Sequence, residues 1–481
     1  MKRMHPSSTF WLRIALACVI LALSGMMPYP SVVRQGFQDA HSAMQAGKPE
    51  LAAKALRRVV EAQPWRKELW QIAGQDALAA QDPKAAIVAL ERARVEQAIT
   101  ADGLIALGDA YLQERNLPSA MRAWKDAVRT GMPAEEAFEK MYFQQREQGD
   151  LIGARLTLQE WLARNPNSVE PLYQSGLLLA VLDPERAIPV LLDAAGRSPD
   201  LSSRVETLRK GLNLAVASGD PVAARLQVGR SLSTLGEWRL AQVCFEEATV
   251  LDPGYAEAWA FLGEARQQMQ QDGYPDLERA AGLAPDSVVV QALFSVYYRR
   301  QGQPERAVAY LEKIAAQEPD QALWQMEMGN ALSESGDLVA ALPHYLQAVA
   351  LEPASPMYWA ELARFSITNN HDVRGVALPA AREALQLAPK DPVVLDLNGQ
   401  VMYNLGDMAS AERFLQRALE IDSSNASAHL HLGQVYVQWQ RMEQAQVHLS
   451  AAVKLNGDGP VGMIARRLLD RFFANQSTPE P

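Results

Sequence analysis

The sequence predicts an all-α protein, an α-solenoid of about twelve helix-turn-helix repeats with an extra seam helix and a C-terminal capping helix. Segments of helical composition recur at an interval of 34 residues. Most units also contain a second small residue twelve positions after the first, and a proline near their end, which stops a helix. The first small residue of successive units is Ala40, Gly74, Gly108, Gly176, Gly229, Gly263, Ser295, Gly329, Ala363, Gly399 or Gly433, and Tyr142 takes its place in the fourth unit.

Each unit is expected to hold a helix A, a short turn and a helix B. The chain is rich in Ala, Leu, Gln and Glu, and runs of Val, Ile or Thr are scarce, which favours helices over strands. Small residues at two fixed positions let paired helices approach closely. Glycines at the turns are Gly149, Gly236, Gly302, Gly336 and Gly406. Because one helix pair cannot bury its apolar face alone, stability requires stacking of neighbouring units.

Two segments show a known pattern. LIALGDAY at 104–111 and HLHLGQVY at 429–436 each place Leu, Gly and Tyr at the same spacing, and Ala120 and Ala445 follow. In this respect the chain resembles the tetratricopeptide repeat (TPR) family, over roughly residues 33–459. The resemblance implies a solenoid whose A helices line a concave groove, in which partner proteins bind as extended peptides or short helices.

One interval breaks the period. Gly176 and Gly229 are 53 residues apart, which equals one period plus about one helix. We therefore expect a first TPR array at 33–201, a seam helix at 202–221 and a second TPR array at 222–459. A diverged repeat at the same place is the alternative.

The C-terminal end is expected to be capped by a helix at 460–474. Ile464, Leu468 and Leu469 would form its buried face, and polar residues including Arg466 would face solvent. A cap of this kind closes the exposed end of a solenoid. The tail 475–481 is polar and is expected to be disordered.

Residues 1–30 have the composition of a signal peptide or an N-terminal membrane anchor. Lys2 and Arg3 precede an apolar stretch, and Ala22-Leu23-Ser24 resembles a signal-peptidase site. The uninterrupted apolar part is short for a spanning helix, so both forms stay open. Either one would leave the repeat body outside the cytoplasm, membrane-anchored or exported, because the positive charges stay inside. A buried first helix of a cytosolic protein is the alternative.

The composition argues against several function classes. The net charge is −10, which disfavours nucleic acid as a partner, since phosphate binding needs a basic face. Two cysteines offer neither a disulfide framework nor a metal quartet. The only glycine-loop motif, at 457–462, follows a repeat helix and is interpreted as a helix stop and start. His429 and His431 are two apart, so a shared metal is disfavoured. We expect no enzyme activity, no cofactor, no metal and no small-molecule substrate.

The groove residues follow from the register of helix A. The predicted partner-binding positions are Arg230, Glu264, Arg299, Arg300, Asn330, Arg364, Gln400, Tyr403, Asn404 and Gln434. In the first array the same line contains Asp109 and Phe143. Arginine and asparagine can hold carbonyls or carboxylates, which predicts an acidic or carbonyl-rich peptide partner at the second array. The alternative is that the arginines pair with Glu264, Glu327 or Glu361 and bind nothing.

From these observations we expect a protein–protein interaction scaffold that binds partner segments in its groove, in cell-envelope assembly or secretion. The envelope role is implied by membrane-tethered relatives of the family. The alternative is a non-catalytic subunit of a membrane-associated enzyme or a glycan-processing complex.

Overall fold

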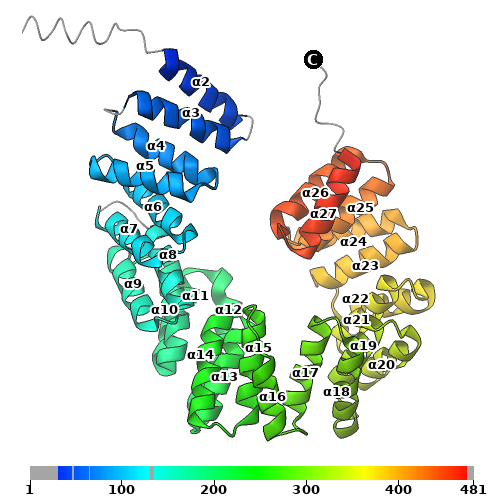
Figure 1. The fold of residues 1–481 in the computed structure, drawn as a ribbon. Helices are drawn as coiled ribbons and strands as arrows, with labels where there is room; N and C mark the ends of the chain where they lie inside the picture. Colours follow the sequence, from blue (N-terminus) through cyan, green and yellow to red (C-terminus); the bar gives the residue numbers. More distant parts are fainter. Residues whose placement is uncertain (1–30, 46–47, 64–65, 131–134, 474–481) are drawn as a thin grey trace, which may run out of the picture. The chain divides into compact units, whose positions relative to one another are not determined.

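The computed structural model describes residues 31–45, 48–63, 66–130 and 135–473 (Figure 1). Within these ranges every regular element is helical, and no strand occurs. The all-α prediction is therefore confirmed. The expected leader (1–30) and tail (475–481) lie outside the described residues, and their assignments stay predictions.

The chain divides into two compact units, residues up to Cys244 and residues from Phe245 on. Each is described by itself. The first unit contains α2 (Ser31–Gln45), α3 (Pro49–Ala62), α4 (Glu68–Ala79), α5 (Pro83–Val95), α6 (Ala101–Gln113), α7 (Leu117–Arg129), α8 (Glu135–Glu147), α9 (Leu151–Arg164), α10 (Val169–Leu182), α11 (Pro184–Arg197), the 3-10 turn η1 (Pro199–Leu201), α12 (Ser202–Ala217) and α13 (Pro221–Thr234). The boundary falls within α14 (Trp238–Leu251).

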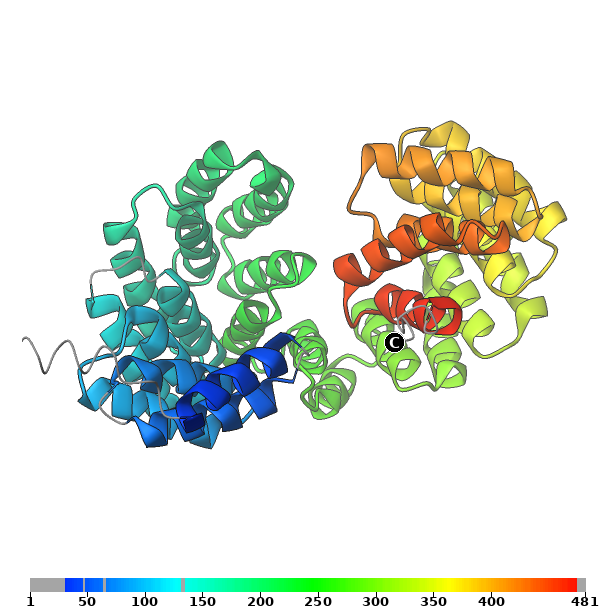
Figure 2. The same cartoon turned by 90° about the horizontal axis from the view of Figure 1, so that it is seen from above.

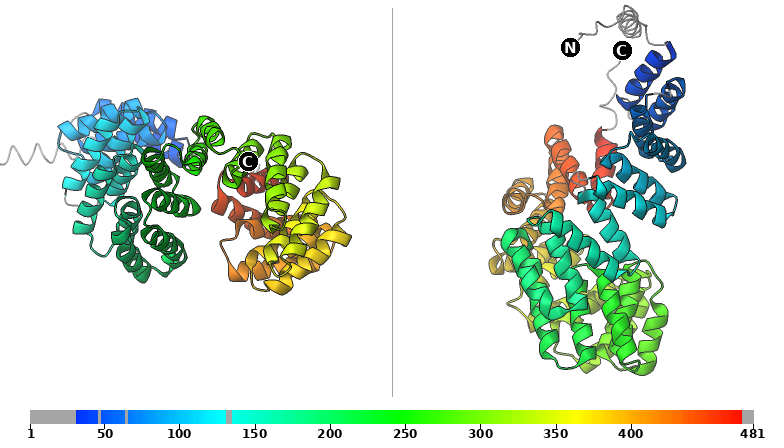
Figure 3. Two further views of the ribbon diagram at one scale, coloured as in Figure 1. Left: turned by 90° about the horizontal axis from the view of Figure 1, so that it is seen from below. Right: turned by 90° about the vertical axis from the view of Figure 1, so that its left-hand side faces the viewer.

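The second unit continues the same alternation of helices. It contains α15 (Ala256–Gln268), α16 (Tyr274–Leu283), α17 (Val288–Arg300), α18 (Pro304–Gln317), α19 (Ala322–Glu334), α20 (Leu338–Leu351), α21 (Pro356–Thr368), the π turn η2 (Val373–Ala377), α22 (Leu378–Leu387), α23 (Pro392–Asn404), α24 (Met408–Ile421), α25 (Ala426–Gln438), α26 (Met442–Asn456) and α27 (Pro460–Phe473). Within each unit, successive helices stack in pairs (Figures 2 and 3).

The two helices of a repeat approach each other closely at the small residues that the sequence predicts. A Cβ atom added to Gly329 of α19 would lie 2.9 Å from the Tyr345 ring of α20, and one added to Gly433 of α25 would lie 2.7 Å from Leu449 of α26. Gly108 faces the fully buried indole of Trp124 in the same way. Larger residues at these positions would force the paired helices apart.

A left-handed residue follows helix A in ten of the repeats. It lies seven positions after the small residue, as Gln81 follows Gly74 and Gln440 follows Gly433. All five predicted turn glycines have positive φ. Five other turns place Gln81, Arg115, Gln270, Asn370 or Gln440 there, also with positive φ, and no glycine marks these turns in the sequence.

The helix α12 occupies the range expected for the seam helix. It buries Val205, Leu208 and Leu212 and packs between α11 and α13. Gly211 brings it against Ser231 of α13.

Two units depart from the 34-residue period, and the structure absorbs each locally. The 32-residue unit has a short helix, α16, whose preceding Gly273 packs on the backbone of Gly263. The 36-residue unit contains η2, which starts after Asp372 in a left-handed conformation. The Asp372 carboxylate accepts a hydrogen bond from the Gly375 N–H at 2.9 Å. Neither irregularity breaks the stack on its two sides.

The capping helix exists, but one residue of its predicted buried face is wrong. α27 packs on α26 through Ala465 and Phe473, with Leu468 and Leu469 half-buried. Ile464 is 43% exposed, because the seam against α26 follows positions 461, 465, 468–469 and 473. Arg466 faces solvent as predicted.

Candidate functional site

Nine of the ten predicted groove residues lie on the A helices of the second unit. Glu264 is on α15, Arg299 and Arg300 end α17, and Asn330 is on α19. Arg364 is on α21, three residues are on α23, and Gln434 is on α25. Arg230 is exposed on α13 in the first unit, so it belongs to a different body from the others.

Arg300 and Glu264 form a two-bond ion pair between α17 and α15. The guanidinium nitrogens Nη1 and Nη2 donate to the two carboxylate oxygens at 2.7 and 2.6 Å. The Glu264 side chain is only 10% exposed, and it also accepts a hydrogen bond from Gln268. The pair therefore connects neighbouring repeats with a largely buried carboxylate.

Arg299 is shared by two carboxylates of the next A helix, α19. Its Nη1 lies 2.5 Å from Glu327, and its Nε and Nη2 donate to Glu334 at 2.8 and 2.6 Å. Hydrogen bonding to Glu334 is the main cause that raises the pKa of Arg299. The guanidinium is therefore held charged between two acids.

Asn330 lies between those two acids on the same helix, one turn from each. Its side-chain oxygen accepts a hydrogen bond from the Tyr345 hydroxyl at 2.6 Å. Burial is the main cause that raises the pKa of Tyr345, so its hydroxyl stays protonated and keeps donating. This bond fixes which way the Asn330 amide points. Its Nδ2 donates to none of the described residues.

The remaining positions are more exposed. Arg364 contacts Glu361 of its own helix at 3.3 Å and is 43% exposed. The Gln400 amide donates to Asp396, and Asn404 donates to the Gln400 carbonyl, both within α23. Tyr403 packs against the core cluster, and the Gln434 side chain has intermediate exposure.

The three predicted groove arginines of the second unit therefore have carboxylate partners. The pairings Arg300–Glu264, Arg299–Glu327 and Arg364–Glu361 are those that the alternative interpretation named. An acidic ligand would have to displace these glutamates. Asn330 is the candidate whose donor remains available next to an oriented acceptor.

A pocket of about 510 Å³ lies between α6 and α8 in the first unit. Its lining includes Asp109 and Phe143, which the groove register predicts, with Trp124 also contributing. Lys140 bridges Asp109 at 3.1 Å and Glu136 at 3.3 Å. Burial is the main cause that raises the pKa of Asp109. Lys140 could not be predicted from the sequence, because its position follows from contact between two repeats and not from the register.

No group of three or more His, Cys, Asp or Glu able to hold a metal occurs in the part of the chain that the structure describes. His429 faces His448 of α26, and His431 faces Asp396 of α23, so the two neighbours point to different partners. At the glycine-rich loop, Gly457 has positive φ and the Gly462 N–H donates to Asn456, which ends one helix and starts the next.

Family models support the repeat assignment. Models described as tetratricopeptide repeat match residues 73–135, 294–356 and 402–463. The chain is therefore a helical-repeat protein, and these segments are tetratricopeptide repeats. Proteins with such repeats are in general non-catalytic scaffolds that bind other proteins or peptides.

Individual relatives are distant. The chain is 23% identical to the cellulose synthase operon protein C of Pseudomonas fluorescens over 69% of its own length and 29% of that protein. It is 25% identical to a human protein O-mannosyl-transferase over 44% of its length and 24% of the relative. It thus spans less than a third of the length of either one. Among solved structures, yeast Tom70 aligns over 78% of this chain and 96% of its own, at 13% identity and a TM-score of 0.43.

None of the described helices is both long enough and apolar enough to cross a membrane. The apolar leader lies outside the described residues.

Proposed function

We propose that the chain is a scaffold that binds segments of partner proteins along the A helices of its second unit, in cell-envelope assembly or secretion. The oriented Asn330 amide is the observation on which this proposal chiefly rests. Its Nδ2 is available to hold a backbone carbonyl, and Tyr345 holds it in place before a ligand arrives. Pre-orientation of this kind lowers the entropic cost of binding.

The ion pairs have a supporting role in this proposal. Arg299 and Arg300 connect three successive A helices through Glu264, Glu327 and Glu334. They fix the spacing of the helices that a bound segment would cross. Peptide recognition then depends on amides rather than on free cations, and a carbonyl-rich segment fits better than an acidic one.

The discriminating variant is Asn330→Asp. It keeps an oxygen that accepts from Tyr345 but replaces the Nδ2 donor with an acceptor, so the fold is retained and a carbonyl ligand is repelled. Full-length chain is immobilised, exposed to a detergent-solubilised envelope fraction, and the bound proteins are quantified by mass spectrometry. We expect capture to fall at least about tenfold, which corresponds to roughly 1.4 kcal/mol.

Two variants control this experiment. Tyr345→Phe removes the orienting hydroxyl and should give an intermediate loss. Asn213→Asp makes the same chemical change at an exposed position of α12 in the first unit and should leave capture unchanged. Undiminished capture by a folded Asn330→Asp chain would place the binding site elsewhere.

A second candidate is a non-catalytic subunit of a membrane-associated enzyme or glycan-processing complex. The similarity to a cellulose synthase operon protein and to a protein O-mannosyl-transferase favours it. In that case the captured proteins would include a glycan-synthesising or glycan-modifying enzyme, and adding the chain would change its activity. A captured set without any such enzyme would remove this candidate.

The location outside the cytoplasm is also a proposal, supported by the charge and apolar pattern of residues 1–30. A reporter that is active only outside the cytoplasm, fused after residue 481, should be active. Mature protein beginning near Gly25 would indicate a cleaved signal, and intact chain at the membrane would indicate an anchor. Intact chain recovered only from the soluble cytosol would contradict both.

A further inference from the structure

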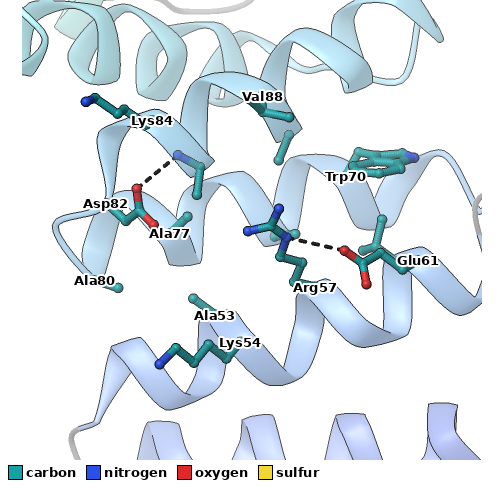
Figure 4. Close-up of a pocket in the computed structure, with 14 residues that line it drawn as sticks. Ala53, Lys54, Arg57, Glu61, Trp70, Ala77, Ala80, Asp82, Lys84 and Val88 are labelled. Atoms are coloured by element: carbon teal, nitrogen blue, oxygen red, sulfur yellow. Dashed lines mark hydrogen bonds and ion pairs between the residues drawn. The ribbon is translucent and has the colours of Figure 1, made fainter.

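A second pocket lies in the first unit, on the side where its B helices run. It measures about 650 Å³ and is enclosed by α3, α4 and α5 (Figure 4). α3 and α5 are the B helices of consecutive repeats, and α4 is the A helix between them. This outer pocket is therefore distinct from a groove lined by A helices.

The outer pocket exists because small side chains face one another across it. Six of the residues that line it are alanines, contributed by all three helices, and Val60 and Val88 add apolar surface. Trp70 of α4 closes one end (Figure 4). Val88 is 66% exposed although it is aliphatic and lies beside other apolar groups. Exposure of this apolar surface to water is unfavourable, so a ligand that covers it gains binding free energy.

The charges at the rim are not balanced. Arg57 is paired with Glu61 at 3.3 Å, and Asp82 accepts the Ala85 N–H at the start of α5. Lys54 and Lys84 extend from the opposite walls α3 and α5 at the end away from Trp70 (Figure 4). Neither lysine contacts a carboxylate among the described residues.

We propose that the outer pocket binds a short amphipathic helix of a partner protein that presents aliphatic side chains and a carboxylate at one end. The aliphatic side chains would cover the alanine floor and Val88, and the carboxylate would lie at the end away from Trp70, within reach of Lys54 or Lys84. Glu61 and Asp82 on the same rim disfavour a multiply charged phosphate headgroup, whereas a single carboxylate needs only one of the two lysines. Helix-in-groove binding of this kind uses aliphatic anchors one turn apart.

The probe is a pair of synthetic helical peptides of about four turns. Both have leucines at i, i+3 and i+4. One has glutamates in its first turn, and its counterpart has lysines there. With the full-length chain, we expect the acidic peptide to bind, to weaken as salt is raised, and to protect α3 and α5 from hydrogen exchange. We expect no binding of the lysine peptide.

Two variants locate the site. Val88→Asp puts a charge on the apolar rim, and Lys54→Glu with Lys84→Glu reverses both cations. Each should weaken acidic-peptide binding at least about tenfold. Their matched controls are Val95→Asp, a 73% exposed valine of α5 outside the pocket, and Arg58→Glu with Lys125→Glu, two exposed cations outside it. The controls should bind like the wild type.

Several outcomes would overturn the proposal. These are equal binding of both peptides, no binding of either, protection confined to other helices, or unchanged affinity of the Val88→Asp chain. Binding of phosphatidylglycerol vesicles that competes with the peptide would assign the pocket to lipid instead. If the chain forms a dimer and the Val88→Asp substitution dissociates it, the occupant of the outer pocket is a second copy of the chain. Because the hydrogen-exchange test uses the wild type, it decides the question even if a variant does not fold.

Discussion

The two units connect their repeats differently. In the second unit the ion pairs Arg300–Glu264 and Arg299–Glu334 join residues 36 and 35 apart, which is one repeat. In the first unit Arg146 of α8 donates to Glu237, at the start of α14, 91 residues away. Arg204 of α12 contacts the same carboxylate.

The seam helix explains this difference. α12 is inserted between α11 and α13, and α10 and α13 still touch. The start of α14 also meets α8, which belongs to a non-adjacent repeat, and there Arg239 donates to the backbone carbonyl of Arg146. Between residues 245 and 473 the ion pairs that link repeats join neighbours only, as in a one-dimensional array, whereas the first unit has at least one connection that bypasses a repeat.

The largest loss of stability should come from removing the ion pair between Arg146 and Glu237. The Glu237 side chain is 14% exposed and that of Arg146 is 13% exposed. Glu237→Ala removes the carboxylate and leaves the largely buried Arg146 guanidinium without this partner. Breaking a buried ion pair on one side costs about 3 kcal/mol or more. We expect hydrogen exchange to increase in both α8 and α14, although they belong to non-adjacent repeats. An increase confined to α13 and α14 would mean that the first unit also couples neighbours only.

Gly329→Leu should have the next largest effect and should stay local. The added side chain meets the Tyr345 ring, and overpacking of this kind costs about 1–3 kcal/mol. Extra opening should be limited to α17 through α22 in the second unit. Uniform loss of protection across the described residues would argue for one cooperative core instead of an array.

Arg300→Ala should cost about 1–3 kcal/mol, because it leaves the largely buried Glu264 carboxylate without its main partner. Arg364→Ala is the matched comparison. Its pair with Glu361 is exposed and lies within one helix, so its loss should cost at most about 0.5 kcal/mol. Denaturant titration of both variants measures the difference. Equal costs would mean that the link between repeats contributes nothing beyond a surface pair.

The smallest effect concerns pH and is expected in the second unit. Burial, and then the charge of His429, lowers the pKa of His448, and burial lowers the pKa of His344. Their folded pKa values lie below the ordinary value of about 6.5, so the unfolded chain binds more protons as pH falls below it. Stability of the second unit should therefore decrease from about pH 7 to about pH 5. His448→Gln should reduce this dependence, and an unchanged pH profile would contradict it.

The repeat positions could be predicted from the sequence, because they depend on residue size at a fixed interval. Gly329, Gly399 and Gly433 lie where the paired helices touch, and the turn glycines have positive φ. The interval of 53 residues predicts an extra helix at 202–221, and α12 (Ser202–Ala217) lies in that range; its role as a seam between two arrays stays a prediction.

The sequence could not predict which polar side chains of the groove register form ion pairs or hydrogen bonds with each other. Arg299 and Asn330 are both polar groups in the groove register, yet the structure neutralises the first with two acids and leaves a donor free on the second. Which case applies depends on rotamers and on the spacing between repeats. Ile464 was misplaced for a similar reason, since the crossing of α27 over α26 sets which of its apolar residues are covered.

The turn after helix A has a consequence for how such a chain can change over evolutionary time. A left-handed conformation costs a residue such as Arg115 about 1–2 kcal/mol. Glycine avoids that strain, but it loses more conformational freedom on folding, at roughly 0.5–1 kcal/mol. The two penalties offset each other in part, so exchange between glycine and a polar residue changes stability here by only about 1 kcal/mol. Repeats can therefore be copied and drift apart at this position without altering their length or their stacking.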